Sequence, residues 1–380
     1  MKDAHTFPTI GILGGGQLGR MLALAGIRMG LKIRFLNPEP SGPMEGLGEH
    51  MIGDWNEAGV LRSFAEQCDV LTVESEWAPA DRLALVLPEG AALWPSPETL
   101  HVIRHKGRQK QRLVEARLPV PDFRLCATPE DALQAASDFG FPVVLKKYRG
   151  SYDGYGNATA DSEAEVLLAW NALANRDGLL VETRVPFVRE LAVLIARSPG
   201  GQCVTYPVAH TIQLEHRCHT VVVPADVPRT VIEEAERVSL GAVEAVGGVG
   251  ITAVELFERE DGRILINELA PRPHNTGHYS IEGCHTSQFE NHLRGILGWP
   301  LGSTALREPV AVMVNVLGTR DGPARPEGLT EALAVKGVAV HLYGKREARR
   351  KRKLGHVTTT GSDRADTIER AQRAARMILL

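Results

Sequence analysis

The chain has 380 residues, 43% of them hydrophobic and 23% charged, and this ordinary globular composition predicts about two or three domains. No stretch approaches the ~18 consecutive apolar residues of a membrane helix, and residues 1–9 lack the apolar core of a secretory signal, so we expect a cytoplasmic protein. The five cysteines are scattered and form no CxxC pair, which argues against a disulfide framework or a structural zinc site.

Charge is distributed unevenly along the chain. The net charge is −3, but residues 345–380 hold eleven Lys and Arg against four Asp and Glu, which is +7. The basic run at 345–353 has three interpretations: a nucleic-acid patch, a solvated loop, or a cluster that serves one phosphorylated small molecule. Because the run contains no aromatic residues and the rest of the chain is acidic, we do not expect nucleic acid as a partner.

The first hundred residues alternate strand and helix patterns. Short apolar runs predict strands at 9–13, 31–36, 70–73 and 91–94, and the stretch 17–30 is typical of a helix. Strands separated by segments of helix length indicate βαβ units, so we expect an α/β region with a parallel sheet.

From about residue 101 the pattern changes to a mixture of strands and helices, which predicts an α+β central part. The expected helices are at 106–117, 163–175, 230–246 and the C-terminal end, and the expected strands are at 141–146, 178–183, 189–196, 204–207, 310–317 and 338–343. Two further strands are joined by Asp261-Gly262, a dipeptide that is typical of a two-residue hairpin turn.

The first predicted strand is followed by Gly14-Gly15-Gly16-Gln17-Leu18-Gly19, which matches the G-x-G-x-x-G pattern of a turn that opens a helix. A nicotinamide enzyme would need an acidic residue at the end of the second strand, but that strand ends in Asn37-Pro38 and Glu39 lies beyond the proline. We therefore interpret the segment as a phosphate-binding loop. An NAD site and a purely structural tight turn remain the alternatives.

A second candidate for phosphate binding follows the strand that ends at Lys146. The glycine-rich stretch 149–156 comes directly after it. A lysine beside such a loop can neutralise phosphate oxygens while backbone N–H groups of the loop cover them. Downstream, backbone groups at 182–185 could contact an adenine edge and Glu190 could reach a ribose. The alternative for that segment is ordinary sheet.

Two carboxylates give the most informative pattern. With a two-residue turn at Asp261-Gly262, Glu255 and Glu268 lie directly opposite each other in largely apolar surroundings. Facing carboxylates repel and resist burial, and a hard divalent cation such as Mg²⁺ resolves this. The polar loop at 267–278 then follows as a candidate acceptor and oxyanion site. The alternatives are an exposed hairpin with solvated glutamates, and ordinary surface histidines in the loop.

These motifs together resemble the ATP-grasp ligases and, within them, the N5-carboxyaminoimidazole ribonucleotide synthetase family. The resemblance spans nearly the whole chain and is carried by Gly14 to Met21, by Tyr152-Asp153-Gly154-x-Gly156, by Asn267 to His278 and by Thr286-Ser287-Gln288-Phe289-Glu290. It implies an ATP-grasp fold with a Rossmann-like domain at 1–104, an ATP-grasp domain at 105–300 whose flap covers about 120–186, and a small C-terminal domain at 301–380.

The resemblance also implies roles for individual residues. ATP would be bound by Lys106, Lys146, Ser151, Tyr152, Asp153, Gly154, Tyr155, Gly156, Asn157, Glu182, Thr183, Arg184, Val185, Glu190, Gln213, Asn267 and Glu268. Mg²⁺ would be bound by Glu255 and Glu268. The ribonucleotide would be bound by Gly16, Gln17, Leu18, Glu76, Tyr152, Arg272, His274, Asn275 and Lys353, and the catalytic residues would be Asp153, Arg272 and Lys353.

The sequence departs from the family pattern in three places. Ser151 stands where glycine is common, Lys106 stands where arginine is often found, and Glu74-Ser75-Glu76-Trp77 replaces a more typical Phe-Glu pair. The first two changes are compatible with the implied roles. The third leaves the role of Glu76 open.

The activity that the resemblance implies is the ATP-dependent carboxylation of 5-aminoimidazole ribonucleotide with bicarbonate, in purine biosynthesis. It also implies a homodimer and a product that passes to the N5-carboxyaminoimidazole ribonucleotide mutase. The nearest alternative is the formate-dependent glycinamide ribonucleotide transformylase, although that family generally has Glu where Gln17 stands. A nicotinamide oxidoreductase and an RNA-binding protein are further alternatives, and neither explains the pair formed by Glu255 and Glu268.

Overall fold

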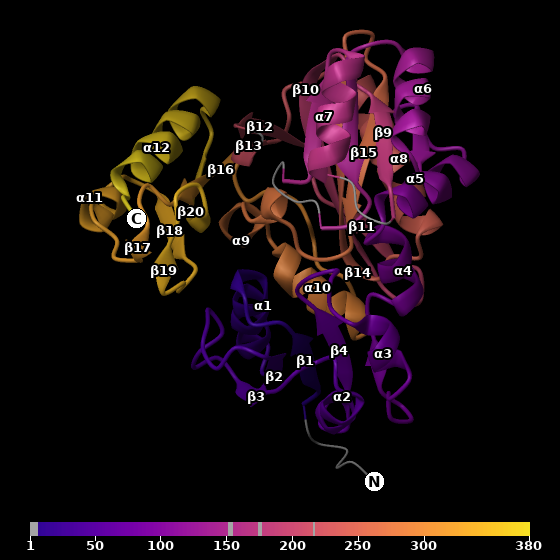
Figure 1. Cartoon of the computed structure of the whole chain (residues 1–380). Coiled ribbons are helices and arrows are strands. Elements are labelled where there is room, and N and C mark those ends of the chain that lie inside the picture. The colour runs from indigo at the N-terminus through magenta and orange to yellow at the C-terminus, as the bar shows by residue number, and fades with distance from the viewer. Residues whose placement is uncertain (1–6, 151–154, 174–176, 216) are drawn as a thin grey trace.

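The computed structural model describes residues 7–150, 155–173, 177–215 and 217–380. In Figure 1 the N-terminal region (indigo) lies below the central region (magenta to orange), and the C-terminal region (yellow) lies to one side. Within the described ranges, no helix combines the length and the apolar character that crossing a membrane would require.

The N-terminal region is a parallel sheet of five strands in the order β3-β2-β1-β4-β5, which confirms the predicted parallel sheet. Its strands are β1 (Thr9–Leu13), β2 (Lys32–Asn37), β3 (Glu49–Ile52), β4 (Val70–Val73) and β5 (Ala92–Leu93), and its helices are α1 (Gln17–Arg28), α2 (Ala58–Ala65) and α3 (Ala80–Ala84). From β1 the chain continues to β2 on one side and later to β4 on the other side, so the strand order reverses at β1. The crevice at the carboxyl ends of β1 and β4 is therefore a favoured place for a ligand.

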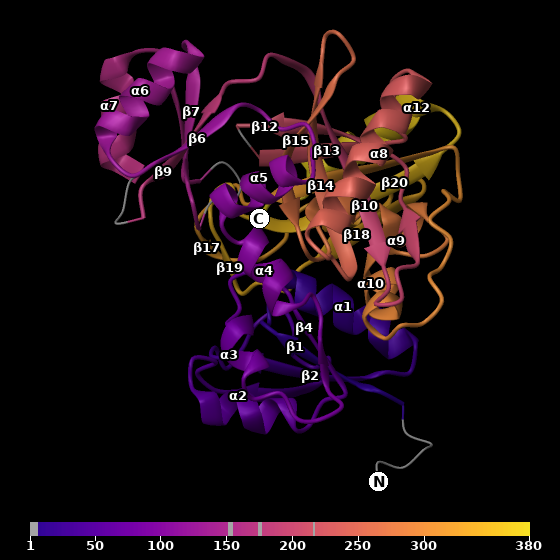
Figure 2. The ribbon, with the colours of Figure 1, turned by 90° about the vertical axis from the view of Figure 1, so that its right-hand side faces the viewer.

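A four-stranded antiparallel sheet in the order β6-β9-β7-β8 forms the flap, with α6 and α7 on one face (Figure 2). Its elements are β6 (Phe123–Cys126), α6 (Pro129–Phe139), β7 (Val143–Lys147), β8 (Asn157–Ala160), α7 (Glu163–Leu173) and β9 (Leu179–Thr183). Helices α4 (Pro97–Ile103) and α5 (Lys106–Glu115) connect the N-terminal sheet to this flap.

The largest element is a nine-stranded sheet in the order β15-β14-β10-β12-β13-β16-β20-β18, with β11 paired to β10. Its strands are β10 (Phe187–Arg197), β11 (Cys203–Thr205), β12 (Ala209–Leu214), β13 (Arg217–Val223), β14 (Gly250–Arg259), β15 (Ile264–Ala270), β16 (Val310–Leu317), β18 (Val338–Leu342) and β20 (Lys353–Gly361). The central and C-terminal regions therefore share one continuous sheet.

Several helices and short segments cover this sheet and join it to its surroundings. They are α8 (Arg229–Ala245), the 3₁₀ turn η1 (Asn275–Gly277), α9 (Ser280–Gly283), α10 (Gln288–Ile296), α11 (Leu329–Leu333), α12 (Arg364–Met377), and the small strands β17 (Gly322–Pro323) and β19 (Glu347–Ala348). Phe289 and Leu293 of α10 share a hydrophobic cluster with Met21 and Leu22 of α1. This packing attaches the N-terminal sheet to the central region.

Several strands were not expected from the sequence, and five of them have a local explanation. The edge strand β3 has no apolar run, and β20 begins inside the basic run. The hairpin of β12 and β13 lacks a glycine turn, and Glu215 takes up the left-handed backbone there with φ 49°. The short strand β8 follows the glycine-rich loop.

Glu255 and Glu268 lie directly opposite each other on β14 and β15, as predicted, but the predicted two-residue turn is wrong. The backbone of Arg259 bonds to that of Arg263 at 2.9 Å, so the turn has three residues, and Gly262 adopts φ +76° at its end. Closer to the site, Asn267 is an extra residue that bulges from β15 and shifts the register by one. The longer turn and the bulge cancel, and the two carboxylates face each other.

Candidate active site

A cavity of about 950 Å³ opens where the N-terminal sheet, the flap and the nine-stranded sheet meet. It brings together most of the predicted site residues, namely Gly16, Gln17, Leu18, Glu76, Lys106, Lys146, Asn157, Glu182, Thr183, Arg184, Val185, Glu190, Gln213, Glu255, Asn267, Glu268, Arg272, His274, Asn275 and Lys353. Tyr155 and Gly156 are described but do not line the cavity. Ser151, Tyr152, Asp153 and Gly154 lie outside the described residues.

The two facing glutamates differ in their electrostatic surroundings. The ammonium group of Lys106 at the start of α5 forms an ion pair with Glu268 and, against the effect of burial, holds the pKa of that carboxyl below its ordinary value. Burial and then the charges of Glu268 and Glu190 raise the pKa of Glu255 to about 8. Without a cation Glu255 therefore holds a proton near neutral pH, and a cation between the two carboxylates would keep it ionised.

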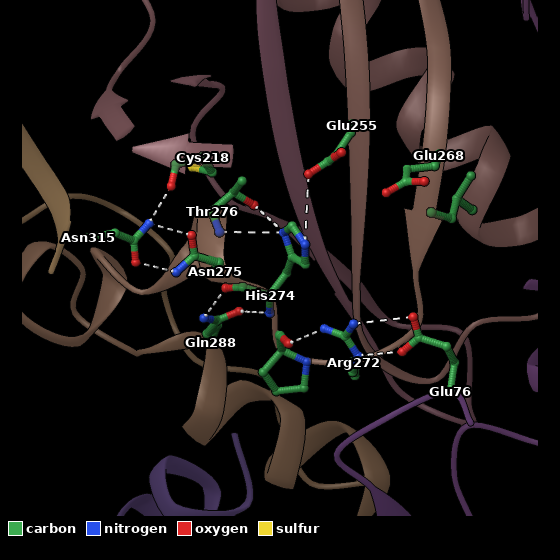
Figure 3. Close-up of polar contacts among 12 residues, drawn as sticks. Glu76, Cys218, Glu255, Glu268, Arg272, His274, Asn275, Thr276, Gln288 and Asn315 are labelled. Carbon is green, nitrogen blue, oxygen red and sulfur yellow. Dashed lines mark hydrogen bonds and ion pairs between the residues drawn. The ribbon is translucent and has the colours of Figure 1, made fainter. Parts of the chain in front are cut away.

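This donor set fits a hard divalent cation. Both glutamates present oxygen donors from opposed strands, they are partly buried with side-chain exposures of 27% for Glu255 and 34% for Glu268, and both face the cavity (Figure 3). Oxygen ligands from carboxylates, completed by phosphate oxygens, are what Mg²⁺ prefers. The exposed hairpin that we kept as an alternative is excluded, because the two carboxylates line a cavity.

A buried group of three charges lies beneath the flap. The carboxylate of Glu182 forms ion pairs with the ammonium group of Lys110 at 3.0 Å and with that of Lys146 at 2.6 Å. Burial alone would raise the pKa of Glu182, but the two lysines hold it at about 2. The side chain of Glu182 is thus committed to these lysines, and only its backbone remains available for an adenine edge.

Lys110 does not line the cavity but supports Glu182, which does, and our sequence analysis made no prediction for it. It lies one helical turn after Lys106, is 2% exposed, and burial lowers its pKa to about 8 although Glu182 opposes that shift. The surrounding sequence, Lys106 to Arg112, is strongly polar and indicates an exposed helix. The spacing of four residues from Lys106 was the available signal, because it puts both lysines on one face of α5.

Arg272 and Glu76 form a bidentate ion pair between the loop after β15 and the segment after β4. The guanidinium Nε donates to Glu76 Oε2 at 2.6 Å and Nη2 donates to Oε1 at 3.3 Å (Figure 3). Against the effect of burial, Arg272 holds the pKa of Glu76 below its ordinary value. Both residues line the cavity, so the unusual Glu74 to Trp77 segment still places a carboxylate in the site.

His274 is held as a neutral ring beside Glu255. Its Nδ1 lies 2.9 Å from the hydroxyl oxygen of Thr276 and 3.4 Å from the Thr276 N–H, and its Nε2 lies 3.8 Å from Glu255 Oε1 (Figure 3). Burial, and then the positive charges of Arg272 and Lys353, lower the pKa of His274 well below its usual range. The His274 ring beside Glu255 is therefore neutral and adds no positive charge next to that carboxyl.

The polar loop is packed into the protein and is not a surface feature. His278 is 1% exposed and packs its ring at 5.6 Å from that of Phe289, so the alternative of a surface histidine is wrong. Asn275 exchanges hydrogen bonds of 2.8 and 2.7 Å with Asn315 of β16, which also donates to the Cys218 carbonyl. The Asn275 amide is therefore engaged by Asn315, although Asn275 lines the cavity. Asn315 and Gln288, which contacts the backbone of His274, were given no role from the sequence.

The basic run contributes less to the site than expected. Lys353 at the start of β20 is its one member that lines the cavity among the described residues. Arg346 pairs with Glu45 at 2.8 Å, and Lys351 pairs with Glu215 at 2.5 Å. Most of the run thus lies on the surface and contacts two other regions of the chain.

The interpretation of the glycine turn as a phosphate-binding loop is wrong for two of its donors. The N–H groups of Gly16 and Gly19 donate to Glu74 Oε1 at 2.6 Å and to Glu74 Oε2 at 2.8 Å. A carboxylate of the protein itself therefore occupies the position that a phosphate would take. The same contact removes the basis for the nicotinamide alternative.

Family models match this chain in three consecutive segments. Residues 7–104 match the ribonucleotide synthetase preATP-grasp domain, residues 111–289 match the ATP-grasp domain, and residues 311–370 match the phosphoribosylaminoimidazole carboxylase C-terminal domain. The fold is thus that of an ATP-grasp ligase, as expected.

Curated relatives narrow this assignment. The chain is 40% identical over 374 residues to the N5-carboxyaminoimidazole ribonucleotide synthase of Mycobacterium tuberculosis, covering 97% of this chain and 87% of that protein. It belongs to the N5-carboxyaminoimidazole ribonucleotide synthase family. It is also 40% identical over 93% of its length to the chloroplastic phosphoribosylaminoimidazole carboxylase of Vigna aconitifolia, of which it spans 64%.

Solved structures agree with the family over the whole chain. An ADP complex of an N5-carboxyaminoimidazole ribonucleotide synthetase superposes with a TM-score of 0.89 at 36% identity, covering 97% of this chain and 96% of that one. The Aspergillus clavatus enzyme in complex with ADP and 5-aminoimidazole ribonucleotide gives a TM-score of 0.88 at 31% identity, covering 98% of each chain.

Proposed function

We propose that this chain catalyses the ATP-dependent carboxylation of 5-aminoimidazole ribonucleotide with bicarbonate. The products are N5-carboxyaminoimidazole ribonucleotide, ADP and phosphate. The observation that carries the proposal is the facing pair of Glu255 and Glu268, with Lys106 on one of them and His274 beside the other, in a single cavity that also holds Arg272 and Lys353. The relatives named for this reaction, and the solved complexes with ADP and with the ribonucleotide, support it.

We assign the nucleotide to the part of the cavity between the flap and the nine-stranded sheet. Lys106 and Lys146 would neutralise the phosphate oxygens, together with the loop Ser151 to Asn157. The backbone of Glu182 to Val185 would contact the adenine, Glu190 the ribose, and Gln213 the nucleotide as well. The stacked rings of Phe187 and Phe257, 4.8 Å apart, add an apolar wall to this part of the cavity.

Bicarbonate is a poor electrophile, so one of its oxygens would first attack the γ-phosphate of ATP and give carboxyphosphate and ADP. The lysines would stabilise the charge that develops on the phosphoryl oxygens. Mg²⁺, held by Glu255 and Glu268 with Asn267 beside them, would supply further positive charge to those oxygens when bound. The facing carboxylates support this assignment, because a cation between them would offset the repulsion that raises the pKa of Glu255.

The exocyclic amine of the ribonucleotide would then take the carboxyl group, directly or as released CO₂, and phosphate would leave. Gly16, Gln17, Leu18, Glu76, Tyr152, Arg272, His274, Asn275 and Lys353 would surround the ribonucleotide. Arg272 and Lys353 would balance the charge of the activated carboxyl group, and we assign Asp153 to the handling of the amine proton.

Phosphate release from ATP tests the proposal directly. With Mg²⁺ present, we expect release to depend on both bicarbonate and 5-aminoimidazole ribonucleotide, and we expect label from ¹³C-bicarbonate to enter the ribonucleotide product. A parallel reaction with formate and glycinamide ribonucleotide should give no turnover. Phosphate release at the same rate with and without the ribonucleotide, or turnover in the parallel reaction, would contradict the proposed function.

The family likeness also supports three further parts of this proposal. We propose the domain division 1–104, 105–300 and 301–380, a homodimer, and a mutase as the protein that takes up the product. Sedimentation of the purified chain tests the dimer, and a coupled assay with the mutase tests the transfer of product.

A further inference from the structure

The carboxylate of Glu74 lies inside the first glycine turn of the N-terminal sheet. Glu74 follows β4 directly, and its backbone N–H donates to the carbonyl of Leu13 at 3.1 Å, at the end of β1. Its two carboxylate oxygens accept separately from the N–H groups of Gly16 and Gly19, at 2.6 and 2.8 Å. Gly16 and Gly19 are the N-cap and third residues of α1, so Glu74 supplies the cap that a glycine cannot provide itself.

The three glycines of the G-x-G-x-x-G pattern all make room for this one side chain. A Cβ atom on Gly14 would lie 2.4 Å from Glu74 Cγ, one on Gly16 would lie 2.6 Å from Oε1, and one on Gly19 would lie 3.0 Å from Oε2. Distances under 3.0 Å are too short for a real Cβ contact, so alanine is excluded at Gly14 and Gly16 while Glu74 keeps its place. The contacts of Glu74 therefore account for the glycine pattern without a bound nucleotide.

We infer that this glycine turn is built around the carboxylate of Glu74, and that Glu74 is a positioning residue for Gly16, Gln17 and Leu18, which line the active-site cavity together with Glu74 itself. The N–H groups and the helix N-terminus that would attract a phosphate act here within the protein. A dinucleotide or phosphate at this turn would have to displace this half-buried carboxylate.

The same short segment after β4 also contacts the loop after β15, which lines another part of the cavity. Two residues after Glu74, the carboxylate of Glu76 forms its bidentate pair with Arg272. One segment after β4 thus contacts the glycine turn through its first glutamate and the loop after β15 through its second. A substitution at Glu74 should therefore weaken binding of the ribonucleotide more than binding of ATP, because the lysines assigned to ATP lie on α5 and β7.

Two variants of Glu74 test the inference. Glu74→Ala removes both acceptors, and Glu74→Gln keeps the shape but can accept through only one atom. We expect both folded variants to raise the KM for the ribonucleotide by about tenfold or more while the KM for ATP changes little. Added acetate should lower the raised KM of Glu74→Ala, because it can occupy the vacated position. Glu66→Ala removes an exposed carboxylate from the same region and should match the parent chain in every measurement.

A second measurement keeps the inference separate from the proposed function, on which the kinetic arm rests. Amide hydrogen exchange in a peptide covering residues 14–20 should be faster in Glu74→Ala than in the parent, and acetate should slow it again. If both Glu74 variants keep the parent's exchange rate in that peptide, the inference fails, whatever the activity. If the parent lacks turnover with the ribonucleotide but the exchange and acetate results hold, the proposed function fails and the structural role of Glu74 stands.

Discussion

Gln288 holds the backbone of His274 from both sides. Its Oε1 accepts from the His274 N–H at 2.9 Å, and its Nε2 donates to the His274 carbonyl at 2.8 Å and to Nδ1 of His278 at 2.9 Å (Figure 3 shows the two contacts to His274). Gln288 is fully buried at the start of α10, which packs on α1. One side chain therefore fixes both histidines of the polar loop and attaches them to the N-terminal region.

Replacing Gln288 with leucine should displace His274 without removing it. Gln288→Leu has a similar volume but removes the acceptor of the His274 N–H, while the His274 carbonyl keeps only its bond from the Gly277 N–H at 3.0 Å. We expect a loss of about 1–3 kcal/mol in unfolding free energy. Among folded molecules the KM for the ribonucleotide should rise more than the KM for ATP. Gln134→Leu on the exposed face of α6 is the matched control and should leave both constants unchanged. Equal constants for Gln288→Leu and the parent would contradict the positioning role.

The pair of glutamates predicts the effect of Glu268→Gln. This change removes one of the two charges that would face Mg²⁺, so we expect ATP turnover to be lost while the fold is kept. Because it relieves the repulsion with Glu255 but also removes the partner of Lys106, the free energy of unfolding without metal should stay within about 1 kcal/mol of the parent. Glu260→Gln in the exposed turn of the same hairpin is the control. Near-normal turnover of Glu268→Gln would argue against the metal site.

Acid stability should report on Glu182. Its pKa of about 2 lies below the ordinary value of 4.5, so its ionisation stabilises the folded state above pH 4.5 and this contribution is lost as pH falls towards 2. In Glu182→Gln, unfolding free energy measured across this range should fall less steeply with decreasing pH, by up to about 1.4 kcal/mol per pH unit. Glu165→Gln on the exposed surface of α7 should keep the parent's slope. An unchanged slope in Glu182→Gln would contradict the ion pairs with Lys110 and Lys146.

Lys353 and Lys351 make a matched pair within the basic run. Lys353 lines the cavity, whereas Lys351 lies on the surface and pairs with Glu215. Lys353→Ala should raise the KM for the ribonucleotide far more than that for ATP, and Lys351→Ala should change neither. A filter-binding assay should show negligible affinity for RNA in both variants and in the parent at physiological salt. Normal kinetics in Lys353→Ala, together with salt-dependent RNA binding by the parent, would reverse the assignment.

The features that were predictable from the sequence depend on local patterns. The parallel sheet follows from apolar runs separated by helix lengths, and the pairing of Glu255 with Glu268 follows from alternation along two adjacent strands. The pairing was predicted through a turn that is one residue too short, and the bulge at Asn267 corrects the difference. A bulge depends on contacts across the site, such as that between Lys146 and Asn267 at 3.2 Å, which local patterns do not contain.

The features that were missed depend on partners far apart in the chain. Lys110 is buried because Glu182 meets it from the flap, and Glu74 is committed to a turn 58 residues away from it, at Gly16. In each case a charged side chain in a polar stretch indicates solvent exposure, and a single distant partner reverses that expectation. A G-x-G-x-x-G pattern is ambiguous in the same way. The space that its glycines leave can be filled by a bound phosphate or by a carboxylate of the protein itself.

The strand β16 lies between β13 and β20, so the C-terminal region continues the central sheet by direct backbone pairing, from Thr220 with Val314 to Val223 with Ala311. A chain shortened at residue 300 would leave β13 as an open edge and would remove Val312 and Val314, on which the buried side chain of Val222 packs. Such an edge is a template for intermolecular strand addition. The shortened chain should therefore aggregate rather than persist as an active ATPase. In the intact chain, the central and C-terminal regions should unfold together in one cooperative step.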